Sequence, residues 1–340
     1  MYDLLIIGAG PAGISAAYEA ETAGISYVVI EKGLIGNTIY NYPIGLTVFS
    51  TPDELELLPG GLNPARQKPT REELLSYYVR FVLDNGLNVR TEETVLQVKH
   101  LKDESRDNIK EAVFEVITDK GRYLSNNILF AIGAMDHPRR LGVPGEDLPK
   151  VHHQFRETYP WVRKRALVVG GGNSAGEAAL FLAQEGADTT LAIYRSDWEN
   201  NDPKQGCIKY WVKQPLEEEI REHCLKLFFL GRVVEISPES VILEDETGNQ
   251  ETIENDVVFV LIGADAELGL LKDIGVRFTE GKYSMVPVYD PNTRETNVPG
   301  IFVAGHFTNE RHIKGAIETG RAAVNSIVQR KKHLLQTTAQ

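Results

Sequence analysis

The sequence predicts an α/β fold with two three-layer domains, in which helices cover both faces of a mainly parallel sheet. Short apolar runs at residues 2–7 and 165–169 each end at a glycine, and a helical pattern and a second apolar run follow each of them. A third such run, residues 301–304, ends at Gly305, and we expect it to return to the first domain. A chain of 340 residues is long enough for two domains with separate cores.

Composition and charge exclude several classes of protein. The chain is 42% hydrophobic and 25% charged, as globular proteins are, and its formal net charge of -12 is unsuited to a nucleic-acid backbone. No apolar run reaches the roughly 18 residues that span a bilayer, and no secretory signal precedes the first strand, so we expect a cytoplasmic protein without a membrane segment. Cys207 and Cys224 form neither a disulfide framework nor a CxxC pair, and no residue cluster has metal-site spacing.

The first domain begins with a βαβ unit. After the strand at residues 2–7, a helix is predicted over 14–23 and a second strand over 26–30. The segment 34–68 is rich in Gly, Pro, Asn and Thr and has no periodicity, which predicts a long loop of the kind that often carries function. Alternation over residues 88–129 predicts a small antiparallel insertion.

Helix-terminal signals fix one further helix of this domain. Thr70 is an N-cap, Glu73 completes a capping box with it, and Gly86 ends the helix. The last helix of the chain is predicted over 313–331, after the run that ends at Gly305.

The second domain repeats the first arrangement. Prolines 138, 144 and 149 mark a connector, after which a strand over 165–169, a helix through Glu185 and a strand over 189–194 are predicted. The repeat indicates an internal duplication of a Rossmann-like nucleotide-binding fold.

The first glycine motif, Gly8-Ala-Gly-Pro-Ala-Gly13, fits GxGxxG between a strand and a helix. In this motif Gly8 permits the tight turn, Gly10 lets a pyrophosphate approach the backbone, and Gly13 lets the helix pack on the strand. Glu31 follows at the end of the second strand, where a carboxylate can accept from both ribose hydroxyls, as in FAD or NAD sites. The alternatives are a ligand-free glycine turn and a solvated glutamate.

The second motif, Gly170-Gly-Gly-Asn-Ser-Ala175, is the variant with alanine at the third glycine position. After its second strand comes Arg195 and no acid. An arginine here can pair with a 2'-phosphate, so NADPH is favoured over NADH, with a surface arginine as the alternative. Two such domains predict FAD held permanently and NADPH visiting, with electrons passing between them.

Longer motifs resemble a known family. Phe130-Ala-Ile-Gly-Ala134 and the segment 296–305, together with the two glycine motifs, resemble the low-molecular-weight thioredoxin reductases over nearly the whole chain. A narrower set is similar to the bacillithiol disulfide reductases, flavoenzymes that use NADPH to recycle an oxidised low-molecular-weight thiol. That set comprises Ile39-Tyr-Asn-Tyr-Pro43, Phe49-Ser-Thr51, Lys68-Pro-Thr-Arg71 with Tyr77-Tyr78, and Ile208-Lys-Tyr-Trp-Val212 with Pro215.

The resemblance implies domains and site residues. The FAD-binding domain would comprise residues 1–137 and 263–340, and the inserted NADPH-binding domain residues 138–262. The residues implied at FAD are Gly8, Gly10, Pro11, Ala12, Gly13, Glu31, Lys32, Asn37, Thr38, Tyr42, Val95, Gly133, Gly305, His306 and Lys314. The residues implied at NADPH are Gly170, Gly172, Asn173, Ser174, Ala175, Arg195 and Gly263. The relatives also imply a homodimer.

Three departures from the family affect the expected reaction. Thioredoxin reductases carry CxxC where this chain has Val151–Phe155, so electron transfer to thioredoxin through a dithiol is excluded. Many bacillithiol disulfide reductases carry a cysteine where this chain has Ala12, so a disulfide would be reduced by the flavin directly, or the substrate differs. His306 stands where thioredoxin reductases often have an acid, and it either bonds the flavin's ribityl or phosphate groups or simply packs.

Catalytic residues are not identified by any motif. His152 and His153 occupy the stretch of the missing dithiol and are weak candidates for an acid that protonates a leaving thiolate, with solvated connector histidines as the alternative. Cys224 precedes a predicted strand and is expected to be buried and inert, and a redox role for Cys207 is equally unsupported.

The sequence therefore predicts an NADPH-dependent FAD oxidoreductase that acts on a small disulfide. Two other interpretations remain open. One is a ferredoxin or flavodoxin–NADP reductase of the thioredoxin-reductase type, which passes electrons to a redox protein. The other is a flavoprotein redox sensor without turnover.

Overall fold

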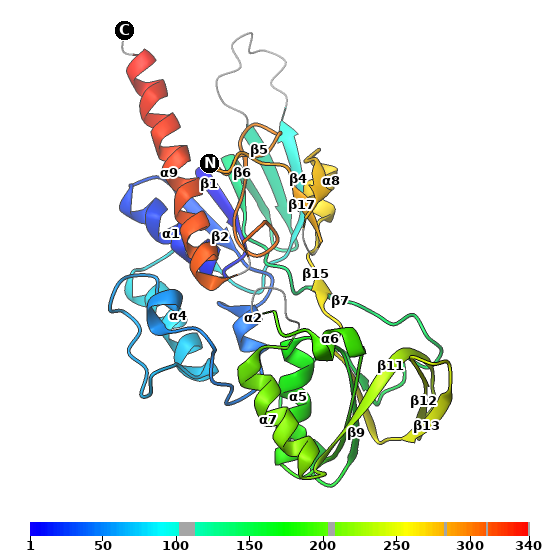
Figure 1. Cartoon of the computed structure of the whole chain (residues 1–340). Helices are drawn as coiled ribbons and strands as arrows, with labels where there is room; N and C mark the ends of the chain where they lie inside the picture. Colours follow the sequence, from blue (N-terminus) through cyan, green and yellow to red (C-terminus); the bar gives the residue numbers. More distant parts are fainter. Residues whose placement is uncertain (102–112, 203–207, 282–283, 311, 339–340) are drawn as a thin grey trace. The chain divides into compact units, whose positions relative to one another are not determined.

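The computed structural model describes residues 1–101, 113–202, 208–281, 284–310 and 312–338. It separates into two compact units, the first comprising Met1–Asp136 and Ala266–Gln340 and the second His137–Asp265 (Figure 1). In the described part of the chain, no helix has both the length and the apolar character to cross a membrane.

The first unit is built on a seven-stranded sheet of order β3-β2-β1-β6-β5-β4, with β18 pairing β6. β1 pairs in parallel with β2 and β6, whereas β4, β5 and β6 are antiparallel neighbours. The strands are β1 (Tyr2–Ile7), β2 (Tyr27–Ile30), β3 (Val89–Arg90), β4 (Val95–Leu101), β5 (Val113–Thr118), β6 (Arg122–Phe130) and β18 (Ile301–Val303). β18 pairs β6 in parallel, which confirms that the third apolar run returns to the first domain. The antiparallel strands are an extension of the central sheet rather than a separate insertion, because β6 also pairs β1.

Helices cover both faces of this sheet. α1 (Pro11–Thr22) and α9 (Ile313–Thr338) lie side by side and share a core with α4 (Arg71–Asp84) (Figure 1). α8 (Gly269–Asp273) packs on the opposite face, against a core that includes alternate residues of β1 and β2. Thr70 caps α4 in a capping box with Glu73, as predicted.

The predicted loop at residues 34–68 contains two one-turn helices, α2 (Asn37–Tyr40) and α3 (Pro52–Leu55). The rest of the segment is loop, as predicted, and the two helices escaped prediction because a single turn is too short to give a helical period. α3 did have a local signal, since Thr51 and Glu54 form a capping box before and within it.

The second unit is a seven-stranded sheet of order β13-β12-β11-β10-β9-β14-β8. β8, β14, β9, β10 and β11 are parallel, and β11, β12 and β13 form an antiparallel edge. The strands are β8 (Val151–His152), β9 (Arg165–Val169), β10 (Asp188–Ile193), β11 (Leu225–Ile236), β12 (Ser240–Asp245), β13 (Gln250–Glu254) and β14 (Val257–Val260). The helices are η1 (Tyr159–Trp161), α5 (Asn173–Gln184), α6 (Arg195–Glu199) and α7 (Tyr210–Arg221).

Two short ladders complete the fold. β7 (His137–Pro138) and β15 (Ala264–Asp265) pair antiparallel where the chain enters and leaves the second unit, and Arg139 forms a two-point ion pair with Asp265 beside them. β16 (Phe278–Glu280) pairs β17 (Met285–Pro287) in the first unit.

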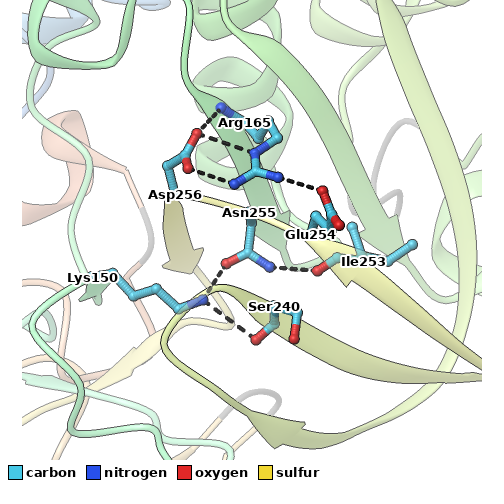
Figure 2. Close-up of polar contacts among 7 residues, drawn as sticks. All are labelled: Lys150, Arg165, Ser240, Ile253, Glu254, Asn255 and Asp256. Atoms are coloured by element: carbon cyan, nitrogen blue, oxygen red, sulfur yellow. Dashed lines mark hydrogen bonds and ion pairs between the residues drawn. The ribbon is translucent and has the colours of Figure 1, made fainter.

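A polar cluster fixes the amino ends of β9 and β14 (Figure 2). The Arg165 backbone N–H and guanidinium donate to Asp256 at 2.8–3.3 Å, and a further guanidinium N–H donates to Glu254 at 2.5 Å. Nearby, Lys150 Nζ lies 2.5 Å from Oδ1 of the buried Asn255. The opposite, carboxyl ends of these strands carry the second glycine motif, so the cluster sets the strand register on which that motif depends.

Candidate functional site

The first glycine motif has the backbone geometry that its sequence predicts. Gly8 has a φ of +109°, and a Cβ there would lie 2.4 Å from the carbonyl oxygen of Ala131. A Cβ on Gly13 would lie 1.9 Å from the Gly8 carbonyl oxygen, so neither position accepts a side chain. A Cβ on Gly10 would meet no atom within 4 Å, which leaves open space at the N-terminus of α1, where helical N–H groups favour an anion.

Glu31 follows β2 and holds this motif in place. Its Oε2 accepts the Ala9 N–H at 2.7 Å, and its Oε1 accepts the Gly33 N–H at 2.7 Å. Burial raises the pKa of the Glu31 carboxyl, while the two backbone hydrogen bonds act in the opposite direction. Each carboxylate oxygen has a second lone pair, so the group can still accept from ribose hydroxyls.

One cavity, which we name the α1 cavity, lies at the N-terminus of α1 within the first unit. All of the residues expected at FAD line it except Gly13 and Lys314. They are Gly8, Gly10, Pro11, Ala12, Glu31, Lys32, Asn37, Thr38, Tyr42, Val95, Gly133, Gly305 and His306.

The α1 cavity also has lining residues that no motif indicated. Asp136 forms an ion pair with Lys32 at 2.8 Å. Glu93 is buried and accepts from the hydroxyls of Thr118 and Tyr123 at 2.6 and 2.9 Å. Both acids lie near predicted residues in the sequence, Glu93 before Val95 and Asp136 after Gly133, but polar residues beyond a strand end are too common to single them out. Further lining residues are Thr94, Met135, Glu267, Leu270, Ile313 and Ala316.

Arg71 holds α2, which forms one wall of the cavity, through hydrogen bonds to its last residue. Its Nη2 and Nε donate to the carbonyl oxygen of Tyr40, the last residue of α2, at 2.5 and 3.2 Å. Arg71 is buried, and its guanidinium carbon lies 5.4 Å from the centre of the Tyr40 ring. The cavity-lining residues Asn37 and Thr38 therefore depend on a charged group outside the cavity.

Lys314 is not among the residues that line the α1 cavity. It lines a separate groove of the first unit, together with acidic side chains of the α3 segment such as Asp53 and Glu56. Lys314 is the second residue of α9, and the packing of α9 against α1 decides which side of the helix faces the α1 cavity.

The second glycine motif repeats the backbone geometry of the first. Gly170 has a φ of +152°, and its Cβ would lie 2.3 Å from the Leu261 carbonyl oxygen. Gly172 precedes α5, and a Cβ there would meet no atom within 4 Å. In the first turn of α5, Asn173 Oδ1 accepts the Lys209 N–H at 2.8 Å.

The other residues expected at NADPH occupy different positions around this loop. Ser174 is exposed on the first turn of α5, and Ala175 is fully buried beneath it. Gly263 has a φ of +98° in the segment between β14 and β15, and its carbonyl oxygen accepts the Arg139 N–H at 2.9 Å.

Arg195 is the first residue of α6, directly after β10. Its Nε lies 2.7 and 2.9 Å from the two carboxylate oxygens of Glu246, and its Nη1 lies 3.5 Å from Glu199. The guanidinium carbon lies 3.8 Å from the centre of the Phe229 ring. The arginine is thus oriented by a ring and engaged by two acids, a pairing that the sequence did not indicate.

Glu177, on the second turn of α5, is a titratable residue that the sequence analysis missed. Its burial raises the pKa of the carboxyl to about 7. The second glycine motif lies one turn earlier on the same helix, so this carboxyl changes charge near neutral pH close to that motif. No sequence signal distinguishes it, because its burial depends on tertiary packing.

The two candidate histidines differ in their surroundings. His152 lies on β8, with ring-centre distances of 5.2 Å to Trp161 and 5.5 Å to Phe259, and burial lowers its pKa. A neutral, packed imidazole is a poor proton donor at neutral pH. His153 Nε2 lies 3.7 Å from Glu146, whose carboxylate accepts the backbone N–H groups of residues 141 and 142. The geometry thus supports packing for His152 and places His153 beside the carboxylate of Glu146.

Cysteine chemistry finds little support in the described residues. Cys224 is exposed between α7 and β11, so the expectation of a buried thiol was wrong, because the buried part of the strand begins only at the next residue, Leu225. Cys207 lies outside the described residues. Ala12, at the position of the family cysteine, is buried against the α1 cavity.

In the described part of the chain, no group of three or more potential metal ligands is gathered in one place.

Comparison with known proteins gives consistent similarities. The model of a protein family described as pyridine nucleotide-disulphide oxidoreductase matches residues 5–305. The chain is 35% identical to the bacilliredoxin reductase of Bacillus subtilis (strain 168), over 97% of this chain and 98% of that protein. It is 28% identical to a ferredoxin–NADP reductase of Ignicoccus hospitalis, over 91% and 90% of the two chains.

The structure supports the same relationship. A bacillithiol disulfide reductase from Staphylococcus aureus matches it with a TM-score of 0.88 at 31% identity, over 97% of this chain and 99% of that one. The predicted fold class, two Rossmann-like three-layer domains with one inserted into the other, is confirmed by this match and by the two sheets.

Proposed function

Because this chain belongs to the pyridine nucleotide-disulphide oxidoreductase family, we propose that it is an NADPH-dependent FAD enzyme that reduces a low-molecular-weight disulfide such as bacillithiol disulfide. The chain is an oxidoreductase whose relatives use a flavin and a pyridine nucleotide. The observation that carries the finer proposal is the contrast between the two glycine motifs. A carboxylate, Glu31, follows the second strand of one unit, and a guanidinium, Arg195, follows the second strand of the other.

The α1 cavity fits a flavin dinucleotide. The open space beside Gly10 lies at the N-terminus of α1, where backbone N–H groups would bind the pyrophosphate. Glu31 has lone pairs left for the ribose, and Asn37, Thr38 and Tyr42 would line the flavin side. When bound, FAD carries two electrons between the nicotinamide and the acceptor, and the residues of the chain bind it, align it and exclude water.

The second unit fits NADPH in the same way. Gly172 leaves open space at the N-terminus of α5 for a pyrophosphate, and Arg195 would pair with the 2'-phosphate that distinguishes NADPH from NADH. We accordingly assign FAD to residues 1–137 and 263–340, and NADPH to residues 138–262.

The reaction that we propose consumes NADPH, one proton and a disulfide, and yields NADP⁺ and two thiols. No described cysteine lines the α1 cavity, so no thiol of the described chain is placed to form a mixed disulfide there. The bound flavin would therefore reduce the disulfide directly, with Ala12 leaving room beside it.

A second candidate is a ferredoxin–NADP reductase, and the alanine at position 12 favours it. A redox-protein acceptor takes electrons without any thiol in the enzyme, and the Ignicoccus hospitalis relative carries that name. We further propose a homodimer in the cytoplasm, on the analogy of the relatives.

The decisive experiment is an anaerobic acceptor screen. The purified flavin-loaded protein is mixed with NADPH and with bacillithiol disulfide, glutathione disulfide or ferredoxin, and NADPH oxidation is followed at 340 nm. Turnover with bacillithiol disulfide supports the first function. Reduction of ferredoxin alone supports the second, and flavin reduction without turnover on any acceptor indicates a sensor.

A further inference from the structure

Arg195, the residue that would recognise the 2'-phosphate, already has an anionic partner in the second unit. Glu246 belongs to the turn between β12 and β13, and both of its carboxylate oxygens lie within 2.9 Å of Arg195 Nε. The two residues are 51 positions apart in the sequence. The β12–β13 turn thus places a carboxylate beside the carboxyl end of β10, where the coenzyme is expected to bind.

The Arg195 guanidinium is also fixed in orientation. It stacks on Phe229 of β11, with 3.8 Å between the guanidinium carbon and the ring centre. A stacked guanidinium keeps its plane when its anionic partner changes, so the carboxylate and an incoming phosphate would compete for the same N–H groups.

A second acid lies near this guanidinium, and a third lies over the second glycine motif. Glu199, one turn along α6, is 3.5 Å from Arg195 Nη1. The Asp197 carboxylate lies over the second glycine motif, since a Cβ on Gly171 would come within 2.1 Å of it. The single positive charge of Arg195 is thus shared between Glu246 and Glu199.

We propose that Glu246 is a specificity-determining residue. Its carboxylate, held beside Arg195 by the β12–β13 turn, competes with the coenzyme's 2'-phosphate for the Arg195 guanidinium. The inference rests on the proposed use of NADPH. Both side chains are partly exposed, 43% for Arg195 and 38% for Glu246, so the ion pair is weak enough for a phosphate to displace. The carboxylate nevertheless stays at high effective concentration because the turn carries it. Glu246 thereby reduces the preference for NADPH that Arg195 alone would give.

Equilibrium binding of 2',5'-ADP and of 5'-ADP by isothermal titration calorimetry tests this without catalysis. Loss of the competing charge in Glu246→Gln should tighten binding of 2',5'-ADP about three- to tenfold and change 5'-ADP binding by less than about twofold. The matched control is Glu244→Gln, because Glu244 forms a similar exposed pair with Arg232 near the same turn. This control removes the same charge but leaves Arg195 paired, so 2',5'-ADP binding should not change.

A double mutant separates competition for Arg195 from general repulsion. In an Arg195→Ala background, Glu246→Gln should lose most of its effect on 2',5'-ADP. Unchanged or weakened 2',5'-ADP binding by the single Glu246→Gln variant overturns the inference, as does an effect that persists in full without Arg195. If neither the parent protein nor Glu246→Gln binds 2',5'-ADP better than 5'-ADP, the proposed NADPH function itself fails.

Discussion

The Glu31 carboxylate accepts the Ala9 backbone N–H through Oε2 at 2.7 Å, so the residue that follows β2 holds the loop between β1 and α1. Its other oxygen accepts the Gly33 N–H at 2.7 Å. Glu31, the residue expected to bind a ribose, thus also holds the phosphate-binding loop in place. Its loss would affect the loop as well as the ligand.

We expect Glu31→Ala to weaken FAD retention. The change leaves two backbone N–H groups without their acceptor, at a cost of about 1–3 kcal/mol each, and removes the ribose contact. The flavin content after dialysis, measured by absorbance at 450 nm, should fall well below that of the parent protein. Asp84→Ala, at the exposed end of α4, is the control. Full flavin content in dialysed Glu31→Ala protein would contradict the role of Glu31.

Arg195→Ala should raise the KM for NADPH about tenfold or more, because a charged hydrogen-bond pair contributes roughly 1.5–3 kcal/mol. The KM for NADH should change little, since NADH lacks the 2'-phosphate. Steady-state kinetics with both coenzymes measure this, and Arg232→Ala on β11 serves as the control because Arg232 pairs only with Glu244 among the contacts described above. Equal effects on the two coenzymes would show that Arg195 does not recognise the 2'-phosphate.

Glu177 makes the stability of the protein depend on pH. Its folded-state pKa of about 7 is above the ordinary value of 4.5, so ionisation opposes folding. That penalty is absent below pH 4.5, grows as the pH rises, and is complete above about pH 7. At pH 8 we expect Glu177→Gln to be more stable than the parent by up to about 3 kcal/mol, from roughly 1.4 kcal/mol per pKa unit.

Urea unfolding midpoints at pH 5 and pH 8 measure this difference. The gain should be large at pH 8 and small at pH 5, whereas Glu185→Gln, at the exposed end of the same helix, should show no gain at either pH. A gain of equal size at both pH values would show that charge burial is not its cause.

Ala12→Cys should introduce a reactive thiol into the α1 cavity. A thiolate attacks a disulfide sulfur, which breaks that S–S bond, forms a mixed disulfide and releases the other half as a thiolate, and Ala12 lines the cavity that we assign to the flavin. After incubation with a small disulfide, mass spectrometry should detect a mixed disulfide at position 12, which Ala12→Ser cannot form. Absence of the adduct would argue that small disulfides do not reach this cavity.

Arg71→Met should loosen the α2 wall. It removes two hydrogen bonds to the Tyr40 carbonyl oxygen from a buried guanidinium, a loss of about 1–3 kcal/mol. We expect a lower thermal midpoint and faster flavin release, which restored FAD fluorescence would report. Arg80→Met, on the exposed side of α4, should behave like the parent protein. An unchanged release rate in Arg71→Met would show that α2 does not depend on this contact.

Features that depend on residues close together in the chain could be predicted from the amino-acid sequence. Gly13 is required because a Cβ there would lie 1.9 Å from the carbonyl oxygen of Gly8, which belongs to the same motif. The capping box of Thr70 and Glu73 spans three residues. Such contacts are encoded within one turn or one strand end, so their spacing in the sequence is enough to predict them.

Which charged side chains contact one another depends instead on how distant segments pack. The pairing of Arg195 with Glu246 depends on the position of the β12–β13 turn, and the partial burial of Glu177 depends on what packs against α5. Lys314 lies away from the α1 cavity because the packing of α9 fixes its facing side. These outcomes depend on register and packing between distant segments, which a local pattern of residues does not record.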